Sequence, residues 1–412
     1  MKIPEIENFL ADTWWYGLSK RLSKEDFESL ALLRAKQGFS FIQLVVGIPP
    51  EVGPENKNAK SAAGFPWNMK GQFNQKYLDL AKERIKILNS VGLKVIVYGA
   101  WGHQIKWLGR NKMIEWWLKI IKTIDDLDVI YCLTGEADIW VGEENILLRS
   151  KSTQDIQSRR FFKHIYKILP KLATKSLNFL RQKIIKKKLE KRREDWTRVL
   201  EKIKVFTDKP FIVHTTPSLS GYDFIQKPEL LIANTVQTGH EYSAINLLWK
   251  LPYNFTRRNP KNIFINLEPW YEGIKNQFWS EDQLFSYWVS MLSGASSYCY
   301  GAHGIWNVGD GKFLSQWGKQ SFKKARDLDT PRLIGLSHKK YLSRKMQGGK
   351  TFFEIRGDTL ITIGKKLNGK FIQYFPDISM ADNIPSGKVW LPLKGKYVGL
   401  IPKEGQVVIF SD

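Results

Sequence analysis

The chain has 412 residues, and its 64 Lys or Arg against 40 Asp or Glu give a formal net charge of +24. Its 43% hydrophobic content is ordinary for a soluble globular protein, and two cysteines are too few for a disulfide framework. No run of about 18 apolar residues could span a bilayer, and the first residues lack the apolar stretch of a signal peptide, so a cytoplasmic location is expected.

Eight short, apolar, β-prone runs recur along the first three quarters of the chain. We expect strands at residues 12–17, 39–46, 93–100, 128–135, 210–216, 230–236, 262–268 and 296–302. Between them, helical patterns are clearest at residues 23–37, 76–91, 111–124 and 281–292. Buried strands that alternate with helices are typical of a parallel sheet.

This repetition predicts an α/β fold, a (β/α)8 TIM barrel within residues 1–335, with a doubly wound open sheet as the structural alternative. The Pro- and Gly-rich segment 48–75 should form a long loop at the C-terminal rim, where barrel active sites lie. Residues 145–205 are interpreted as an inserted helical hairpin with a basic second half. Short strands and Gly-containing turns over 340–412 predict a small antiparallel β-sandwich domain.

Two glutamates stand at the ends of two buried-strand patterns. Glu136 ends the run that begins at Tyr131, and Glu268 ends the run that begins at Ile263. Burying an unpaired carboxylate costs free energy, so a glutamate at the end of a buried strand indicates a functional role or a specific partner. A carboxylate pair at one rim of a barrel is typical of enzymes that process sugars, and we predict that Glu136 and Glu268 are catalytic and that the substrate is a carbohydrate.

Aromatic and polar residues cluster after the same strands. Flat apolar faces can stack on sugar rings while polar groups bind sugar hydroxyls. The predicted stacking platforms are Trp14, Trp15, Trp101, Trp270 and Trp306, and the predicted polar ligands are His103, His214, Gln237, His240, Tyr271, Tyr300 and His303. Asp138 and Glu272 lie further from the strand ends and are expected either to support the catalytic pair or to be surface groups, and Asp12 is expected to orient a neighbouring residue.

Other chemistries have weaker support in the sequence. No His-x-His or His-Glu-x-x-His spacing is present, so no metal or cofactor is expected. A Gly-x-Ser-x-Gly nucleophile elbow and a Gly-rich phosphate-binding loop are also absent. Cys132 and Cys299 are interpreted as core residues. A non-catalytic glycan-binding or glycan-assembly factor on a barrel scaffold remains the alternative function.

The segment 181–193 is strongly basic, with eight Lys or Arg and one Glu. It is either a solvated helix face or an interfacial helix, because Ile184, Ile185 and Leu189 give it a sparse apolar side. An anionic membrane surface or an acidic glycan would suit it, which would place the protein peripherally at the inner membrane. No nucleic-acid-binding signature accompanies it, so no nucleic-acid partner is expected.

Five motifs in chain order resemble the apiosidase-like glycoside hydrolases. They are Asp-Thr-Trp-Trp at residues 12–15, Gly-Phe at 38–39, Gly-Glu at 135–136, Glu-Pro-Trp-Tyr-Glu-Gly at 268–273 and Tyr-Gly-Ala-His-Gly-Ile-Trp at 300–306. The last two are the most specific. The family is a (β/α)8 barrel followed by a small β-sandwich of the collagen-binding type.

The resemblance implies a role for each glutamate. Glu136 corresponds to the general acid/base that closes strand four, and Glu268 to the nucleophile that closes strand seven. These roles imply a retaining glycosidase, whose carboxyl groups should lie about 5–5.5 Å apart, against about 6.5–9.5 Å in an inverting enzyme. The chain differs from the family in having Thr-Gly-Glu at 134–136 instead of Gly-Gly-Asp, in its 145–205 insertion, and in showing no export signal.

Overall fold

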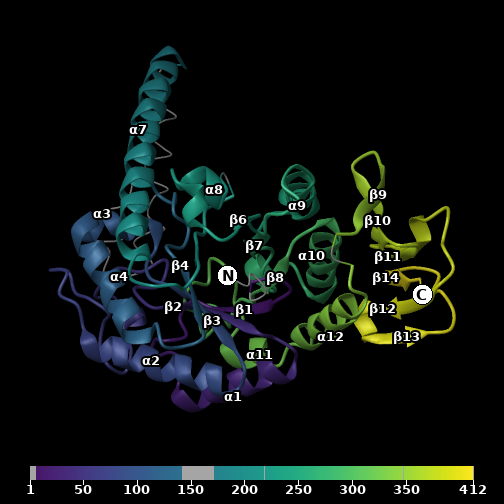
Figure 1. Ribbon diagram of the computed structural model, residues 1–412, viewed down its shortest axis with the longest axis horizontal. Coiled ribbons are helices and arrows are strands. Elements are labelled where there is room, and N and C mark those ends of the chain that lie inside the picture. The colour runs from purple at the N-terminus through teal and green to yellow at the C-terminus, as the bar shows by residue number, and fades with distance from the viewer. Residues whose placement is uncertain (1–5, 142–170, 218, 347, 412) are drawn as a thin grey trace.

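A computed structural model describes residues 6–141, 171–217, 219–346 and 348–411. It contains a parallel barrel and, after it, a separate antiparallel sheet, so the predicted fold class is confirmed (Figure 1). Within these ranges, no helix combines the length and the apolar character needed to cross a membrane.

The barrel has eight parallel strands in the order β5-β4-β3-β2-β1-β8-β7-β6. Their bounds are β1 Leu10–Trp14, β2 Phe41–Val45, β3 Lys94–Tyr98, β4 Val129–Cys132, β5 Phe211–Ile212, β6 Asn234–Gln237, β7 Phe264–Glu268 and β8 Ser297–Tyr300. Between the outer strands of this order, the amide of Ile232 donates to the carbonyl of Phe211 at 3.0 Å, and the Thr235 hydroxyl donates to the carbonyl of Val213. The barrel is therefore nearly closed.

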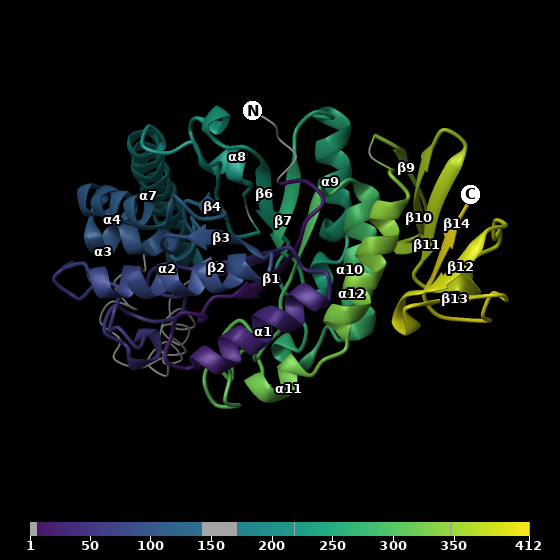
Figure 2. The same cartoon turned by 60° about the horizontal axis from the view of Figure 1, so that its bottom comes forward.

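Helices surround the strands, as Figure 2 shows. They are α1 Lys24–Lys36, α2 Gln75–Ser90, α3 Ile105–Leu108, α4 Arg110–Ile124, α7 Lys171–Lys204, α8 Gly221–Phe224, α9 Leu247–Arg258, α10 Ser280–Ser293, α11 Phe322–Arg326 and α12 Thr330–Ser343. The Ser23 hydroxyl caps α1 by accepting the amide of Asp26 at 3.0 Å. Gly38 follows that helix with φ +89°, a conformation that favours glycine.

The described part of the 145–205 insertion is the long helix α7; the first half of the predicted hairpin lies outside the described residues. The C-terminal third of α7 packs on the barrel through the buried side chains of Trp196, Leu200 and Ile203. The Trp196 indole donates to the carbonyl of Gly102, just after β3, at 3.1 Å. Because Gly102 lies at the C-terminal rim, the part of α7 before Trp196 extends beyond that rim (Figure 1).

The C-terminal region forms one six-stranded antiparallel sheet in the order β13-β12-β14-β11-β10-β9. Its strands are β9 Lys350–Arg356, β10 Thr359–Leu367, β11 Lys370–Phe375, β12 Lys388–Leu391, β13 Lys396–Val398 and β14 Val407–Phe410. Alternate residues of β14 face opposite sides. Val408 and Phe410 join the core shared with the barrel, while Val407 and Ile409 pack in a small cluster of their own.

The sheet packs against α10 of the barrel (Figure 2). The Trp288 ring on α10 stacks on Tyr374 with a centroid distance of 6.2 Å and meets Phe410 edge-on at 6.3 Å. The side chain of Gln406 donates to the carbonyl of Glu281 at 2.8 Å. Large buried aromatic surface makes this contact a continuation of the barrel core.

Candidate active site

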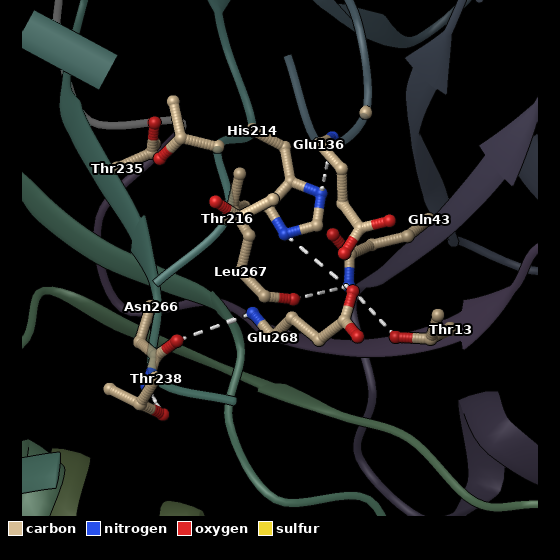
Figure 3. Close-up of polar contacts among 12 residues, drawn as sticks. Thr13, Gln43, Glu136, His214, Thr216, Thr235, Thr238, Asn266, Leu267 and Glu268 are labelled. Carbon is tan, nitrogen blue, oxygen red and sulfur yellow. Dashed lines mark hydrogen bonds and ion pairs between the residues drawn. The ribbon is translucent and has the colours of Figure 1, made fainter. Parts of the chain in front are cut away.

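A pocket opens at the C-terminal ends of the barrel strands. Residues from the ends of seven strands and the loops after them line it: Trp15, Pro50, Glu51, Trp101, Glu136, Gln237, His240, Glu268, Tyr271, Ile274, Trp306 and Trp317. Both predicted catalytic glutamates are among them, and Figure 3 shows them with the polar side chains beneath. The rim that the sequence indicated is therefore the rim that carries the pocket.

Glu136 is positioned by the tight turn after β4. Its backbone has φ +39°, a left-handed conformation that is uncommon for a non-glycine residue and marks a constrained position. A Cβ on the preceding Gly135 would lie 2.4 Å from the Trp101 ring, so only glycine admits that ring. The close approach lets the Trp101 indole donate to the Glu136 carboxyl at 2.9 Å.

Glu268 is positioned by an irregularity at the end of β7. The register with β6 shifts there, because Val236 pairs with Asn266 while Gln237 pairs with Glu268. Such a bulge redirects side chains and is frequent beside active sites. The amide of Glu268 donates to the Asn266 side chain at 3.3 Å, and Asn266 in turn donates to the Thr238 hydroxyl at 3.0 Å (Figure 3).

Two histidines face the two oxygens of the Glu268 carboxylate. His240 Nε2 lies 2.9 Å from Oε1, and His214 Nε2 lies 3.6 Å from Oε2. Each histidine accepts a backbone amide at its Nδ1, that of Tyr271 for His240 and that of Glu136 for His214, both at 3.4 Å. A neutral imidazole that accepts at Nδ1 carries its proton on Nε2, so His240 can donate to Glu268. His214 Nε2 lies beyond hydrogen-bond distance of the carboxylate and makes no hydrogen bond there.

The two glutamates have opposite pKa shifts. Burial, and then the negative charge of Glu268, raise the pKa of Glu136 well above its usual value, and the Trp101 hydrogen bond offsets this only in part. Burial also acts to raise the pKa of Glu268, but the hydrogen bond from His240 and the electrostatic influence of His214 and His240 bring it below its usual value. A pair whose environments separate its pKa values can supply one acid and one base.

Aromatic rings form one wall of the pocket. Trp15 meets Trp101 edge-on at 5.3 Å and Tyr98 edge-on at 4.7 Å, and it stacks on His214 at 6.4 Å. Beneath them, the buried Gln43 side chain donates to the carbonyl of Leu267 at 3.0 Å, which supports the floor of the site (Figure 3). These rings contact one another directly and therefore form one continuous wall.

Three lining residues, Gln237, Tyr271 and Trp306, have a buried polar atom without a hydrogen-bond partner among the described residues. Tyr271 carries a hydroxyl, whereas Gln237 offers an acceptor, Oε1, and Trp306 offers a donor, Nε1. Buried polar atoms are nearly always paired, so an unpaired acceptor and an unpaired donor at one pocket call for an explanation. Hydroxyl groups of a bound ligand can satisfy both, because a hydroxyl donates and accepts.

Seven of the twelve predicted substrate-binding residues belong to this site. Six line the pocket, namely Trp15, Trp101, Gln237, His240, Tyr271 and Trp306. The seventh, His214, is fully buried against both glutamates. Burial, followed by the charge of Glu268, raises the pKa of Tyr271 well above its usual value, so its hydroxyl stays protonated.

The other five expected ligands lie outside the pocket lining. Trp14 points away from the barrel interior, where its ring packs on Phe27 and its indole donates to Asp12 at 2.8 Å. Adjacent strand residues face opposite sides, so Trp14 and Trp15 could not both enter the pocket. Trp270 stacks on Phe278 at 4.6 Å.

The remaining three are buried in supporting positions. The ring of His103 lies between Trp107 and Trp140, and burial lowers its pKa well below the usual value. The His303 ring packs edge-on against Trp306 at 5.8 Å, and burial lowers its pKa to about 4. The third, Tyr300, donates its hydroxyl to a different carboxyl group, that of Glu272.

Glu272 and Asp138 support neighbouring loops. The Glu272 carboxyl accepts the Tyr300 hydroxyl at 2.5 Å and the Thr330 hydroxyl at 2.7 Å, and burial raises its pKa to about 7. Asp138 accepts the amide and the hydroxyl of Thr216, at 2.8 and 2.6 Å. Neither lines the pocket. Asp12 orients Trp14 and pairs with the buried Arg34 at 2.6 Å.

Four lining residues were not predicted individually from the sequence: Pro50, Glu51, Ile274 and Trp317. Pro50 and Glu51 lie in the segment 48–75, which was predicted to form a loop at the C-terminal rim. The position of the loop was therefore predicted, but the contribution of these two residues to the pocket was not. Glu51 has φ +68°, an uncommon left-handed conformation for glutamate. No group of three or more His, Cys, Asp or Glu is arranged to hold a metal ion within the described ranges.

The sequence pattern of the apiosidase-like catalytic domain matches residues 8–347. The chain belongs to the apiosidase-like family. This membership confirms the resemblance drawn from the five motifs, and with it a glycosidase-like function that acts on carbohydrate. No curated protein sequence matches the chain.

Solved structures support the fold at low sequence identity. A glycoside hydrolase matches with 14% identity and a TM-score of 0.67, covering 98% of this chain and 89% of the other. A glycoside hydrolase family 5 protein from Bacteroides vulgatus matches with 15% identity and a TM-score of 0.66, with the same coverage of 98% and 89%. An α-amylase from Lactobacillus plantarum matches with 9% identity and a TM-score of 0.53, covering 98% and 99%.

Proposed function

We propose that this apiosidase-like protein is a retaining glycosidase in which Glu268 is the nucleophile and Glu136 the acid/base. The observation that carries the proposal is the opposite pKa shift of two carboxyl groups in one pocket. A raised pKa favours the protonated form of Glu136, as a general acid requires, and a lowered pKa favours the ionised form of Glu268, as a nucleophile requires.

In the first step, the Glu268 carboxylate attacks the anomeric carbon while the bond from that carbon to the leaving oxygen breaks. Glu136 gives its proton to the leaving oxygen, so the leaving group departs as a neutral alcohol. In the second step, Glu136, now ionised, takes a proton from water, and that water attacks the anomeric carbon and releases Glu268. The His240 N–H holds the Glu268 carboxylate in orientation for the attack through a 2.9 Å hydrogen bond, and His214, 3.6 Å from the other oxygen, adds an electrostatic contribution.

The charge around the pocket favours a neutral sugar ring at the site of cleavage. Glu51, Glu136 and Glu268 line the pocket, and no Lys or Arg is among its lining residues. A carboxylate or sulfate on the bound sugar would meet like charge at short range, which disfavours binding. We therefore infer an uncharged glycosyl unit whose hydroxyls satisfy Gln237 and Trp306.

Hydrolysis of a glycan library, followed by NMR of the first product, tests the proposal. A retaining enzyme releases the sugar with the anomeric configuration of the substrate, and a 2-fluoro glycoside with an activated leaving group should label the peptide that contains Glu268. Release of the opposite anomer would show an inverting enzyme. Glycan binding without hydrolysis by any library member would support a glycan-binding factor instead.

We further propose that the exposed part of α7 binds an anionic membrane surface. Lys186, Lys187 and Lys188 are exposed, and the apolar side chain of Ile184 is 55% exposed. The roughly 20 residues of α7 before Arg192 extend about 30 Å from the rim at 1.5 Å per residue. Cations beside an exposed apolar side chain suit an interfacial helix, and each Lys or Arg near an anionic bilayer contributes roughly 1 kcal/mol.

Liposome flotation tests this second proposal. Lys186→Glu, Lys187→Glu and Lys188→Glu combined should abolish flotation with anionic vesicles at low salt. The matched control carries the same three charge reversals at Lys76, Lys86 and Lys119, which are exposed on α2 and α4, and should still float. Equal behaviour of the two variants would contradict the proposal, and binding to heparin but not to vesicles would identify an acidic glycan as the partner.

A further inference from the structure

The end of the barrel opposite the active site has a second pocket, with a cavity volume of about 590 Å³. Its walls come from the last turns of α9, from the segments that precede β7 and β8, and from β9 and β10 of the C-terminal sheet. Figure 2 shows α9 beside that sheet. Since Asn262 and Ser296 lie just before the strands begin, this pocket is at the N-terminal end of the barrel.

The charge of this second pocket is strongly positive. Four cationic side chains line it, Arg257, Lys261, Lys350 and Lys365, against a single acidic residue, Glu7. Within the part of the chain that the structure describes, none of the four forms an ion pair with a carboxylate within 4.0 Å. Four cations left without carboxylate partners around one cavity create a local field that attracts anions.

Lys365 distinguishes this pocket from a cluster of surface lysines. Its side chain is buried, with 8% exposure, and its ammonium donates to the Tyr341 hydroxyl at 3.2 Å. That hydroxyl in turn donates to the carbonyl of Met291 at 3.2 Å. An ammonium has three donors, and a buried cation is costly unless it is paired with negative charge. The structure gives Lys365 a neutral partner only.

We infer that this pocket binds a tetrahedral oxyanion, phosphate or sulfate, carried on a molecule of sugar size. Lys365 would bind the oxyanion from below, and Arg257, Lys261 and Lys350 would bind it from the rim, because guanidinium and ammonium groups form strong charge-assisted hydrogen bonds with such oxygens. The cavity is far larger than one oxyanion. The Tyr253 ring, 6.0 Å from the Arg257 guanidinium, offers a flat face for the rest of the ligand.

Calorimetric titration of the full chain at low salt tests the inference, with inorganic phosphate, glucose 6-phosphate, glucose 6-sulfate and glucose as probes. We expect both charged sugars to bind more tightly than inorganic phosphate, and glucose not to bind. The comparison of phosphate with sulfate ester identifies the preferred oxyanion. Glu268→Gln should bind the probes unchanged, because its carboxyl lies at the other end of the barrel.

A matched pair of triple variants separates the pocket from general surface charge. Arg257→Gln, Lys261→Gln and Lys350→Gln together should raise Kd by at least roughly tenfold, since a hydrogen bond to a charged group contributes about 1.5–3 kcal/mol. The control, Arg258→Gln, Lys366→Gln and Lys370→Gln, removes the same charge from exposed neighbours outside the pocket and should change Kd by less than about twofold.

Lys365→Met provides a second readout. It should abolish binding while the melting temperature stays the same or rises, because an apolar side chain removes a costly buried charge. Absence of binding by every anion at low salt would overturn the inference. Equal losses in the pocket variant and the control variant would overturn it too, because the anions would then be responding to net charge alone.

Discussion

The two ends of the barrel carry opposite charge. At the C-terminal rim, Glu51, Glu136 and Glu268 line the pocket without a Lys or Arg, whereas four cations and one carboxylate line the pocket at the N-terminal end. A net charge of +24 would lead one to expect an anionic substrate. The comparison teaches that local charge, and not net charge, decides what each end can bind, because charges that are more than about 10 Å apart are screened at 0.1 M salt.

The largest effect is expected from Glu268→Gln at the acidic rim. An amide is a far poorer nucleophile than a carboxylate, so kcat should fall by at least roughly 10⁴-fold. Turnover of a library substrate measures it, and circular dichroism serves as the folding control. Near-normal turnover would remove Glu268 from the mechanism.

Glu136→Gln should have an effect that depends on the leaving group. Loss of the general acid should cost about 10²–10⁴-fold on a natural glycan, but the first step should be almost unchanged with an activated aryl glycoside, which needs little protonation. Comparison of kcat/KM on the two substrates measures the difference. If Asp138→Asn abolished activity while Glu136→Gln left it intact, Asp138 would be the acid.

His240→Ala removes the donor that lies 2.9 Å from the Glu268 carboxylate. The pKa of Glu268 should rise, because this hydrogen bond is a main cause that lowers it. The acidic limb of the pH–kcat/KM profile should therefore move to higher pH, with a loss of roughly tenfold in rate at neutral pH. His240→Gln retains a donor and is the matched control; an identical profile for both variants would argue against the hydrogen bond.

Glu51→Gln removes one of the three acidic side chains that line the pocket. Discrimination between a neutral glycoside and the matching uronic acid glycoside should fall by a few fold, since about 1 kcal/mol of repulsion is lost. The charge of Glu51 also raises the pKa of Glu136. The alkaline limb of the pH profile should thus move to lower pH. An unchanged preference would show that Glu51 does not select against anionic sugars.

The smallest effect is expected from Trp101→Phe, which keeps a ring in the wall but removes the indole N–H. The hydrogen bond from Trp101 lowers the pKa of Glu136. Without it that pKa should rise further, and the alkaline limb should move to higher pH, opposite to the Glu51→Gln shift. The two shifts, measured on one substrate, sharpen the electrostatic description of the rim. Shifts of the same sign would contradict it.

Much of the barrel could be predicted from local pattern. Apolar β-prone runs that alternate with helical segments indicate parallel strands, and a glutamate at the end of such a run is conspicuous because burial makes it costly. Glu136 and Glu268 were therefore visible in the sequence as residues of one rim. The α1 cap at Ser23 was visible too, because a capping hydroxyl acts over three residues.

The sequence pattern could not tell neighbouring residues apart. Trp14 and Trp15 are alike in composition, but only Trp15 reaches the pocket, because strand geometry sends adjacent side chains to opposite sides. Tyr300 and His303 follow a strand as expected, yet Tyr300 is bound to Glu272 and His303 is packed behind Trp306. The orientation of each side chain in these loops depends on contacts with residues of other loops.

The sequence alone determined the barrel, the small β-domain and the rim on which both glutamates stand, since these follow from short-range periodicity and from the cost of burying charge. Only the tertiary structure decided the opposite pKa shifts of the pair, because His214 and His240 reach Glu268 from other strands and loops. The tertiary structure also places Lys365 of the C-terminal sheet and Arg257 of the barrel in the wall of one cavity, although the two residues are 108 positions apart in the sequence. Charges so distant in sequence interact only after the chain has folded, and their effect depends on burial that no local pattern records.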